Sequence, residues 1–150
     1  MPGAQGPSLI PAHAARTGRA HPESAMPASQ YQLDATQDAD TLRLTLRGSS
    51  DRETAAAIAG DVQDLIARHS ARRVLIDMRK LEGRLSTFET HALVRAYRRD
   101  LTAARIAVID LESNRFVNRF HEQAAADHGF QFRFFENPAE AESWLRGEAR

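Results

Sequence analysis

The stretch Val74-Leu75-Ile76-Asp77-Met78 is short and almost continuously apolar, and Ile106-Ala107-Val108-Ile109 is a second run of the same kind. Runs of this length are typical of strands that are covered on both faces of a sheet. Such strands usually lie in parallel sheets, in which helices connect one strand to the next. The two runs therefore predict the central strands of an α/β fold.

Four amphipathic helices are predicted between and beyond these runs. The first follows Ser50-Asp51-Arg52-Glu53, a capping box in which Ser50 is the N-cap. The second covers about 86–99 and is predicted to turn five side chains inward: Phe88, Ala92, Leu93, Ala96 and Tyr97. The third covers about 113–129, and Gly129 suits the position just past a helix end. The fourth opens at Asn137-Pro138, an N-cap followed by a first-turn proline.

Alternating apolar and polar residues predict three more strands. Segments 31–35 and 42–46 form an expected antiparallel hairpin, and 130–135 form a last strand at an edge of the sheet. The order of elements is β-β-α-β-α-β-α-β-α. The predicted fold class is α/β, a five-stranded mixed sheet with about four helices and right-handed crossovers. The pattern leaves the order of the strands in the sheet open.

Residues 1–29 differ in composition from the rest of the chain. They hold five of the six prolines and three of the eight glycines, and the first aromatic residue is Tyr31. Such a segment buries too little apolar surface to offset the entropy lost on folding. We therefore expect a disordered tail over 1–29 and one domain over 30–150, with Met26 as an alternative start of translation.

The composition excludes several functional classes. Twenty Lys and Arg balance twenty Asp and Glu, whereas nucleic-acid-binding proteins usually carry a clear basic excess. The absence of cysteine excludes zinc–thiolate sites and cysteine nucleophiles. No apolar run approaches the roughly 18 residues of a membrane span, and no secretory signal is recognisable, so we expect a cytoplasmic protein.

Several features, taken in order, resemble a known family. They are the opening hairpin, the two apolar runs, the turn Leu81-Glu82-Gly83, and the closing pattern Phe134-Phe135-x-x-Pro138-x-x-Ala141-x-x-Trp144-Leu145. Over about 31–147 the chain resembles the STAS domain of anti-sigma-factor antagonists, especially the sporulation-stage-II-AA-like (STAS/CRAL-TRIO-like) branch. This resemblance implies a bacterial regulatory protein that binds a protein partner, uses no cofactor and is not an enzyme.

The resemblance also implies a candidate modification site. In the antagonists a kinase phosphorylates a Ser or Thr at the start of the helix after the central strand, a position that falls here at Ser86, with Thr87 beside it. Leu85 stands where the antagonists usually carry Asp. Physical chemistry offers a second interpretation, because Ser86-Thr87-Phe88-Glu89 is a capping box in which Ser86 is the N-cap.

Two aspartates form a second candidate site. Asp77 and Asp110 end the two central runs, and ligands of open α/β sheets favour the edge where parallel strands end. A carboxylate pair there could carry out acid–base chemistry or hold a metal, or each carboxylate could simply accept hydrogen bonds from the loop that follows.

The helix at 113–129 carries the remaining candidates. Arg115 and Arg119 lie one turn apart and form either an anion-binding face or a solvated helix face, while Phe116 and Phe120 are predicted to be core. His121 and His128 are seven residues apart, about 10 Å along a helix, which is too far to share one zinc ion. We therefore predict no metal site.

Three functions are compatible with these patterns. The first is a non-catalytic STAS-like regulatory protein that makes protein–protein contacts through 81–88 and the loop after Asp110. The second is a carrier or sensor of a small apolar or anionic, lipid-like ligand, in a cavity lined by Phe88, Leu93, Tyr97, Phe116 and Phe120. The third, ranked last, is an enzyme that uses Asp77 and Asp110. The candidate contact residues for a partner or ligand are Asp77, Gly83, Phe88, Tyr97, Asp110, Arg115 and Arg119.

Overall fold

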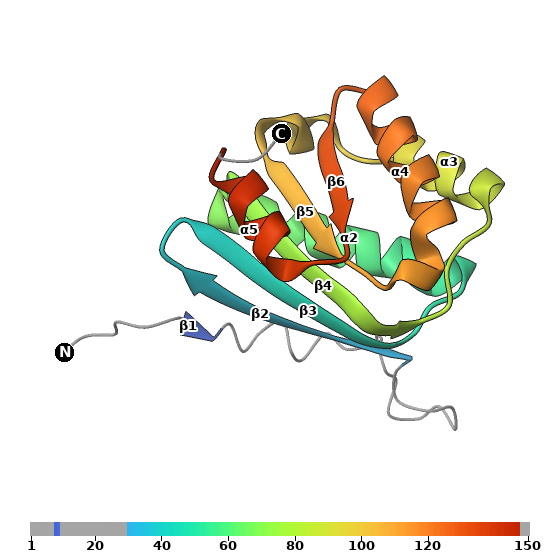
Figure 1. Ribbon diagram of the computed structural model, residues 1–150, viewed down its shortest axis with the longest axis horizontal. Coiled ribbons are helices and arrows are strands. Elements are labelled where there is room, and N and C mark those ends of the chain that lie inside the picture. Colours follow the sequence, from blue (N-terminus) through green and yellow to red (C-terminus); the bar gives the residue numbers. More distant parts are fainter. Residues whose placement is uncertain (1–7, 10–29, 148–150) are drawn as a thin grey trace.

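The protein is described by a computed structural model that covers residues 8–9 and 30–147 (Figure 1). Its sheet has six strands, and their order in space is their order in the chain. These strands are β1 (Ser8–Leu9), β2 (Tyr31–Asp38), β3 (Thr41–Ser49), β4 (Arg73–Glu82), β5 (Arg105–Ile109) and β6 (Gln131–Phe135). The first three are antiparallel and β3 to β6 are parallel, so the sheet is mixed.

All five predicted strands are present, and β6 forms one edge of the sheet as expected. The additional strand β1 is only two residues long and pairs with Thr36 and Gln37 at the end of β2. It falls within the segment predicted to be a disordered tail. The rest of that segment, with the alternative start at Met26, lies outside the described residues.

The helices cover the two faces of the sheet unequally (Figure 1). Three of them, α2 (Arg52–His69), α3 (Thr87–Arg95) and α4 (Arg115–Asp127), lie on one face, together with the 3₁₀ helix η2 (Arg99–Ala103). The fourth, α5 (Pro138–Leu145), packs on the other face against β4, β5 and β6. A short 3₁₀ helix, η3 (Glu112–Asn114), leads into α4.

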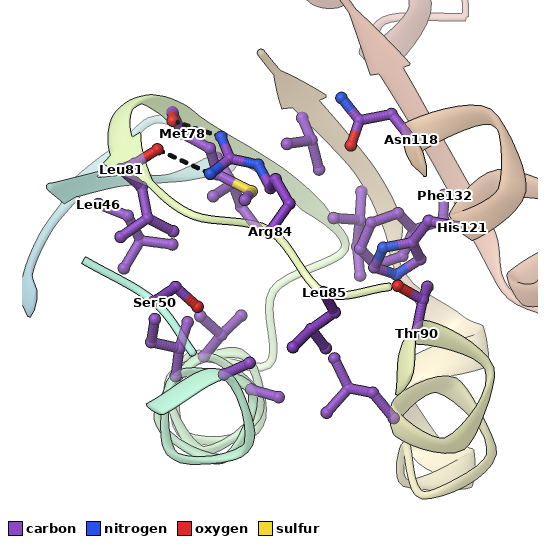
Figure 2. A pocket seen from close by; sticks show the side chains of 18 of the residues that line it. Leu46, Ser50, Met78, Leu81, Arg84, Leu85, Thr90, Asn118, His121 and Phe132 are labelled. Atoms are coloured by element: carbon purple, nitrogen blue, oxygen red, sulfur yellow. Dashed lines mark hydrogen bonds between the residues drawn. The ribbon is translucent and has the colours of Figure 1, made fainter. Parts of the chain in front are cut away.

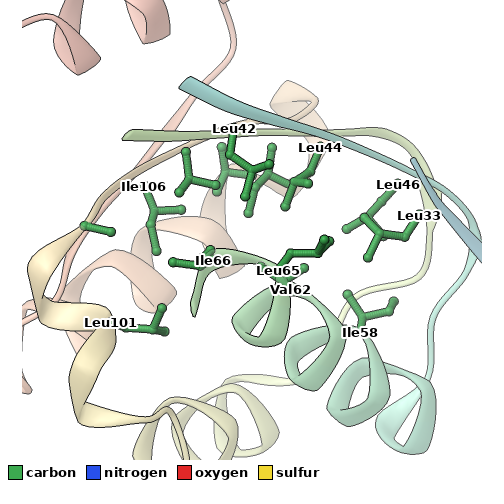
Figure 3. Close-up of a cluster of buried hydrophobic side chains, with 14 of the residues drawn as sticks. Leu33, Leu42, Leu44, Leu46, Ile58, Val62, Leu65, Ile66, Leu101 and Ile106 are labelled. Carbon is green, nitrogen blue, oxygen red and sulfur yellow. The ribbon is translucent and has the colours of Figure 1, made fainter. Parts of the chain in front are cut away.

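Each face has its own apolar core. In the larger core, side chains of α2 such as Val62 and Leu65 point toward leucines of β2 and β3 (Figure 3). The smaller core joins three sheet residues to α5: Leu75, Ala107 and Ile109 against Ala141, Trp144 and Leu145. The central strands β4 and β5 therefore bury side chains on both faces, as their apolar runs predict.

The N-cap of the first helix differs from the prediction. Asp51, not Ser50, accepts the hydrogen bond from the backbone N–H of Thr54. The backbone N–H of Ser50 donates instead to the carbonyl of Glu82 at the end of β4. The strand pairing thus extends one residue into the predicted capping box.

The predicted inward face of the second helix is wrong for three of its five residues, whereas Leu93 and Tyr97 are partly buried as expected. The helix ends at Arg95, its buried residues are Thr90 and Val94, and the Phe88 side chain is 83% exposed. Ala92 and Ala96 are exposed as well. The helix packs mainly on α4. Because of this contact, the side of the helix that faces the protein is not the side with the most apolar residues.

The prediction of a phenylalanine core on α4 is wrong for Phe116, which is 79% exposed, while Phe120 is partly buried. The buried residues of α4 are instead Asn118, Ala124 and Ala125. Small side chains and one amide at these positions let α4 lie close to β6 and α3, with which it makes most of its contacts.

Candidate functional site

An ion pair between Arg84 and Asp110 holds the loop between β4 and α3 to the end of β5. The guanidinium donates through Nε and Nη2 to the two carboxylate oxygens, at 3.1 and 2.7 Å. The Asp110 side chain is 1% exposed and that of Arg84 is 12% exposed. Arg84 also donates to three backbone carbonyls of the turn: those of Met78, Leu81 and Gly83. The pair is thus buried and fully hydrogen-bonded, the condition under which a buried charge is tolerated.

Asp110 also organises the start of α4. It accepts hydrogen bonds from the backbone N–H of Leu111 and from the side-chain amides of Asn114 and Asn118. Asn118 is buried one turn into the helix. Asp110 therefore acts as the loop-binding aspartate that the sequence offered as one alternative.

Gly83 has a conformational role in the same turn. Its φ is +91°, and a Cβ atom at this position would collide with the backbone carbonyl oxygen of Ser50. The close approach lets β4 pair to its end with β3 and places Arg84 under the turn. Only glycine meets both requirements without strain.

The expected pair of Asp77 and Asp110 does not form, which corrects the sequence interpretation. Strand β4 continues to Glu82, so Asp77 lies within the strand and not at its end. Asp77 lies two residues after Leu75, on the α5 side of the sheet, whereas Asp110 is bound from the α4 side. Asp77 pairs instead with Arg79, whose hydrogen bonds lower the pKa of this carboxyl group.

Three predicted site residues meet in a polar hollow between α4 and the ends of β5 and β6. Asp110, Arg115 and Arg119 all line this hollow, whose volume is about 420 Å³. Arg115 donates two hydrogen bonds to Glu136, at 2.8 and 2.9 Å, and thereby lowers the pKa of the glutamate. Glu122 accepts the backbone N–H of Phe134 on the same wall. The hollow thus contains both acidic and basic groups, of which Arg115 and Glu136 form an ion pair.

Ser86 and Thr87 lie at the start of α3, as predicted. Ser86 is exposed; its hydroxyl accepts the backbone N–H of Glu89 at 3.1 Å, and the Glu89 carboxylate accepts the backbone N–H of Ser86 at 3.0 Å. Both bonds of a capping box are present. The structure therefore assigns Ser86 a capping role, which does not depend on any modification.

Three large apolar side chains are strongly exposed among the described residues. They are Phe88, Leu111 and Phe116, with exposed fractions of 83%, 46% and 79%. Phe88 is in the first turn of α3, Phe116 is in the first turn of α4, and Leu111 begins the loop that leads into α4. Helices α3 and α4 pack against each other. We call this set of three the α3–α4 apolar surface.

An apolar cavity of about 120 Å³ lies between α2, α3 and the sheet. Figure 2 shows it between the loop that carries Arg84 and Leu85 on one side and His121 and Phe132 on the other. Of the five residues predicted to line a ligand cavity, Leu93 and Tyr97 do so, whereas Phe88, Phe116 and Phe120 do not. Most of the lining residues belong to α2 and to the sheet, neither of which the sequence predicts as a wall of the cavity.

A hydrogen-bonded aromatic pair forms one wall of this cavity. The Tyr97 hydroxyl lies 2.9 Å from Nε2 of His121, and both rings stack near Phe132. Burial lowers the pKa of His121 to about 4 and raises the pKa of Tyr97 above its usual range. Both side chains are therefore uncharged at neutral pH. The sequence marks His121 only as a candidate metal ligand, and its spacing gives no sign of this role.

Within residues 8–9 and 30–147, no group of three or more His, Cys, Asp or Glu side chains is placed to hold a metal ion. No helix in that part of the chain is long and apolar enough to cross a membrane.

Comparison with known proteins gives matches at the level of structure. No protein-family model and no curated protein sequence matches the chain. An anti-sigma factor antagonist from Mycobacterium paratuberculosis superposes with a TM-score of 0.51 and 14% identity, over 85% of this chain and 98% of that chain. An uncharacterized DUF3478-family protein with a SpoIIAA-like fold, from Shewanella loihica PV-4, superposes with a TM-score of 0.50 and 18% identity, over 81% and 98%. The chain therefore has the STAS-like, SpoIIAA-like fold that its resemblance to that family implies.

Proposed function

We propose that the chain is a non-catalytic regulatory protein of the cytoplasm that acts by binding another protein. Its fold is shared with an anti-sigma factor antagonist, whose name describes a regulator. The observation that carries the proposal is the α3–α4 apolar surface. Single exposed apolar residues are ordinary, but three large ones on adjoining elements favour an interaction site.

The underlying structure supports this use of the surface. The loop that precedes α3 is held by Arg84, and the loop that precedes α4 is held by Asp110, so the two helix starts share one buried anchor. A pre-organised surface loses less conformational entropy when it binds a partner. The polar hollow with Arg115 and Arg119 adjoins the loop after Asp110 and supplies polar contacts at its rim.

Ser86, with Thr87 beside it, is the proposed phospho-acceptor, two residues before Phe88 of this surface. A phosphate on Ser86 would lie near the free N–H groups of α3 but also beside the Glu89 carboxylate, which holds the capping box. Repulsion between the two would open the box and loosen the first turn, where Phe88 lies. Modification would therefore change the shape of the surface as well as its charge.

The direct test is site-specific photocrosslinking in the native host. A photoreactive amino acid at position 88 should capture one defined partner, whereas the same group at Gln32, on the exposed side of β2, should not. The double variant Phe88→Ser with Phe116→Ser should abolish co-purification of that partner, and Gln32→Ala should not. Equal capture from both positions, or unchanged co-purification with the double variant, would overturn the proposal.

The second candidate is a carrier or sensor of a small ligand, and the cavity between α2 and α3 favours it. The two candidates use different parts of α3, because Leu93 faces the cavity and Phe88 faces solvent. Enzymatic use of Asp77 and Asp110 finds no support in the geometry, since each carboxylate is bound to its own arginine on opposite faces of the sheet.

A further inference from the structure

The chemistry of the cavity walls limits what the cavity between α2 and α3 can hold. The walls are mostly aliphatic and aromatic, and no Asp, Glu or Lys is among the lining residues. The aliphatic part comes from α2 and the sheet, with Val62, Ile66 and Val108 as examples. The aromatic part is formed by Tyr97, Phe132 and their neighbours. Such walls favour an apolar ligand body.

The size of the cavity sets an upper limit on the ligand. Its volume is about 120 Å³, and it is partly open to solvent. An apolar cavity of about 150 Å³ in a protein core stays free of water and takes up a benzene-sized molecule. A single ring or a short branched chain therefore fits, whereas a long acyl chain exceeds the space.

The electrostatics of the cavity exclude a charged ligand. Arg84 is the one cation among the lining residues, and its guanidinium already donates to Asp110 and to three backbone carbonyls. His121 is neutral at pH 7 because burial lowers its pKa to about 4. An anionic or cationic ligand would find no free counter-charge in the cavity and would lose its hydration on entry.

His121 offers a polar atom that can orient a ligand. His121 lines the cavity and uses Nε2 for its bond to the Tyr97 hydroxyl, while no residue of the described chain hydrogen-bonds to Nδ1. A neutral imidazole carries one N–H, so Nδ1 is a donor when Nε2 accepts from Tyr97 and an acceptor when Nε2 donates. The pair can therefore complement a ligand hydroxyl in either sense.

We propose that this cavity binds a small uncharged molecule, with one ring or a short branched chain and a single hydroxyl-type group that hydrogen-bonds to Nδ1 of His121. The inference rests on the second candidate function and narrows it, because it excludes long-chain lipids and anions from the site. It does not depend on protein binding through the α3–α4 apolar surface.

The test is a titration of the full chain at pH 7 with probes that differ in one property at a time. Phenol and toluene differ in the hydroxyl group, benzoate and benzylammonium carry opposite charges, and palmitate, compared with benzoate, joins a carboxylate to a long acyl chain. Amide chemical shifts locate each probe and calorimetry measures its affinity. We expect phenol to perturb cavity residues such as Leu93 and Val62 and to bind about three- to tenfold more tightly than toluene, the effect of one hydrogen bond. Both charged probes should bind at least about tenfold more weakly than phenol.

Variants separate the site from other surfaces. His121→Phe keeps an aromatic ring and should remove the preference for phenol over toluene. Ala59→Phe places a larger side chain at a half-buried lining position of α2 and should weaken every probe. Phe88 lies outside the cavity, so Phe88→Ala should change neither the affinity of the probes nor the preference for phenol over toluene.

Two other outcomes have different meanings. If benzoate or palmitate binds more tightly than phenol and is weakened by Ala59→Phe, the cavity is a carrier site but the proposed ligand chemistry is wrong. If no probe perturbs the cavity residues of the folded protein, the proposed ligand chemistry and the second candidate function are both overturned.

Discussion

Replacement of Arg84 by Met tests the anchor that joins the two helix starts. The substitution keeps an unbranched apolar side chain but removes the guanidinium. That group donates five hydrogen bonds, two to Asp110 and one each to the carbonyls of Met78, Leu81 and Gly83. After the change, Asp110 stays buried with a negative charge and without its counter-ion.

The expected loss of stability follows from the burial of the pair. The Asp110 side chain is 1% exposed and that of Arg84 is 12% exposed, and removal of one partner from a buried pair costs about 3–5 kcal/mol. Asp110 keeps three hydrogen bonds, from Leu111, Asn114 and Asn118, which place the cost near the lower limit, at about 3 kcal/mol. The matched control is Arg98→Met, because the Arg98–Asp64 pair is 43% and 48% exposed and contributes at most about 1 kcal/mol.

Urea denaturation followed by far-UV circular dichroism measures both variants. A double-mutant cycle with Asp110→Asn isolates the pair, and the double variant should lose less stability than the two single losses added together. A loss below about 1 kcal/mol for Arg84→Met, or a loss equal to that of Arg98→Met, would refute the assignment of this pair as a buried anchor.

Four other predictions give equally definite expectations. Gly83→Ala should destabilise the protein by more than about 1–2 kcal/mol, since it combines positive φ with a clash against Ser50. Gly60→Ala, within α2 and with open space around the new Cβ, should stabilise it by about 0.8–1 kcal/mol in the same thermal or urea assay. Ser86→Ala should cost about 0.5–2 kcal/mol of stability through loss of the cap, whereas Ser86→Asp should keep most of that stability. Amide exchange over 87–90 reports the change, and equal exchange in the wild type and in both variants would contradict the capping role. His121 has a folded-state pKa of about 4 against about 6.5 when exposed, so the unfolded chain takes up the proton first as the pH falls. Stability should therefore fall by up to about 3 kcal/mol between about pH 6.5 and 4 in urea titrations, and this fall should be absent in His121→Phe.

The strands were predictable because their signal is local. In β2 and β3, apolar and polar residues alternate because successive side chains point to opposite faces of the sheet. In β4 and β5, an uninterrupted apolar run reflects burial of the strand on both faces. The capping box at Ser86 and the Asn137-Pro138 start of α5 are local in the same sense, since each bond joins residues within three positions. These features appear in the structure where the sequence predicts them.

The helix faces were less predictable. Phe88 and Phe116 have the apolar character of core residues but point into solvent, while the polar Thr90 and Asn118 are buried. The direction that a helix presents to the protein depends on its neighbours, and α3 packs mainly on α4. A short helix offers too few residues for its apolar stripe to decide this orientation alone.

The sequence by itself determined the α/β class, the succession of strands and helices and the cap of α3, because each depends on spacing along the chain. Its resemblance to a known family implied the STAS-like fold. Tertiary structure alone decided the sites. The Arg84–Asp110 pair joins residues 26 positions apart, and the Tyr97–His121 pair joins residues 24 positions apart. Asp77 and Asp110 do not meet, because β4 continues past Asp77 to Glu82 and Asp77 therefore lies within the strand. Such contacts depend on strand register and helix packing, in which a shift of one residue turns a side chain to the opposite face.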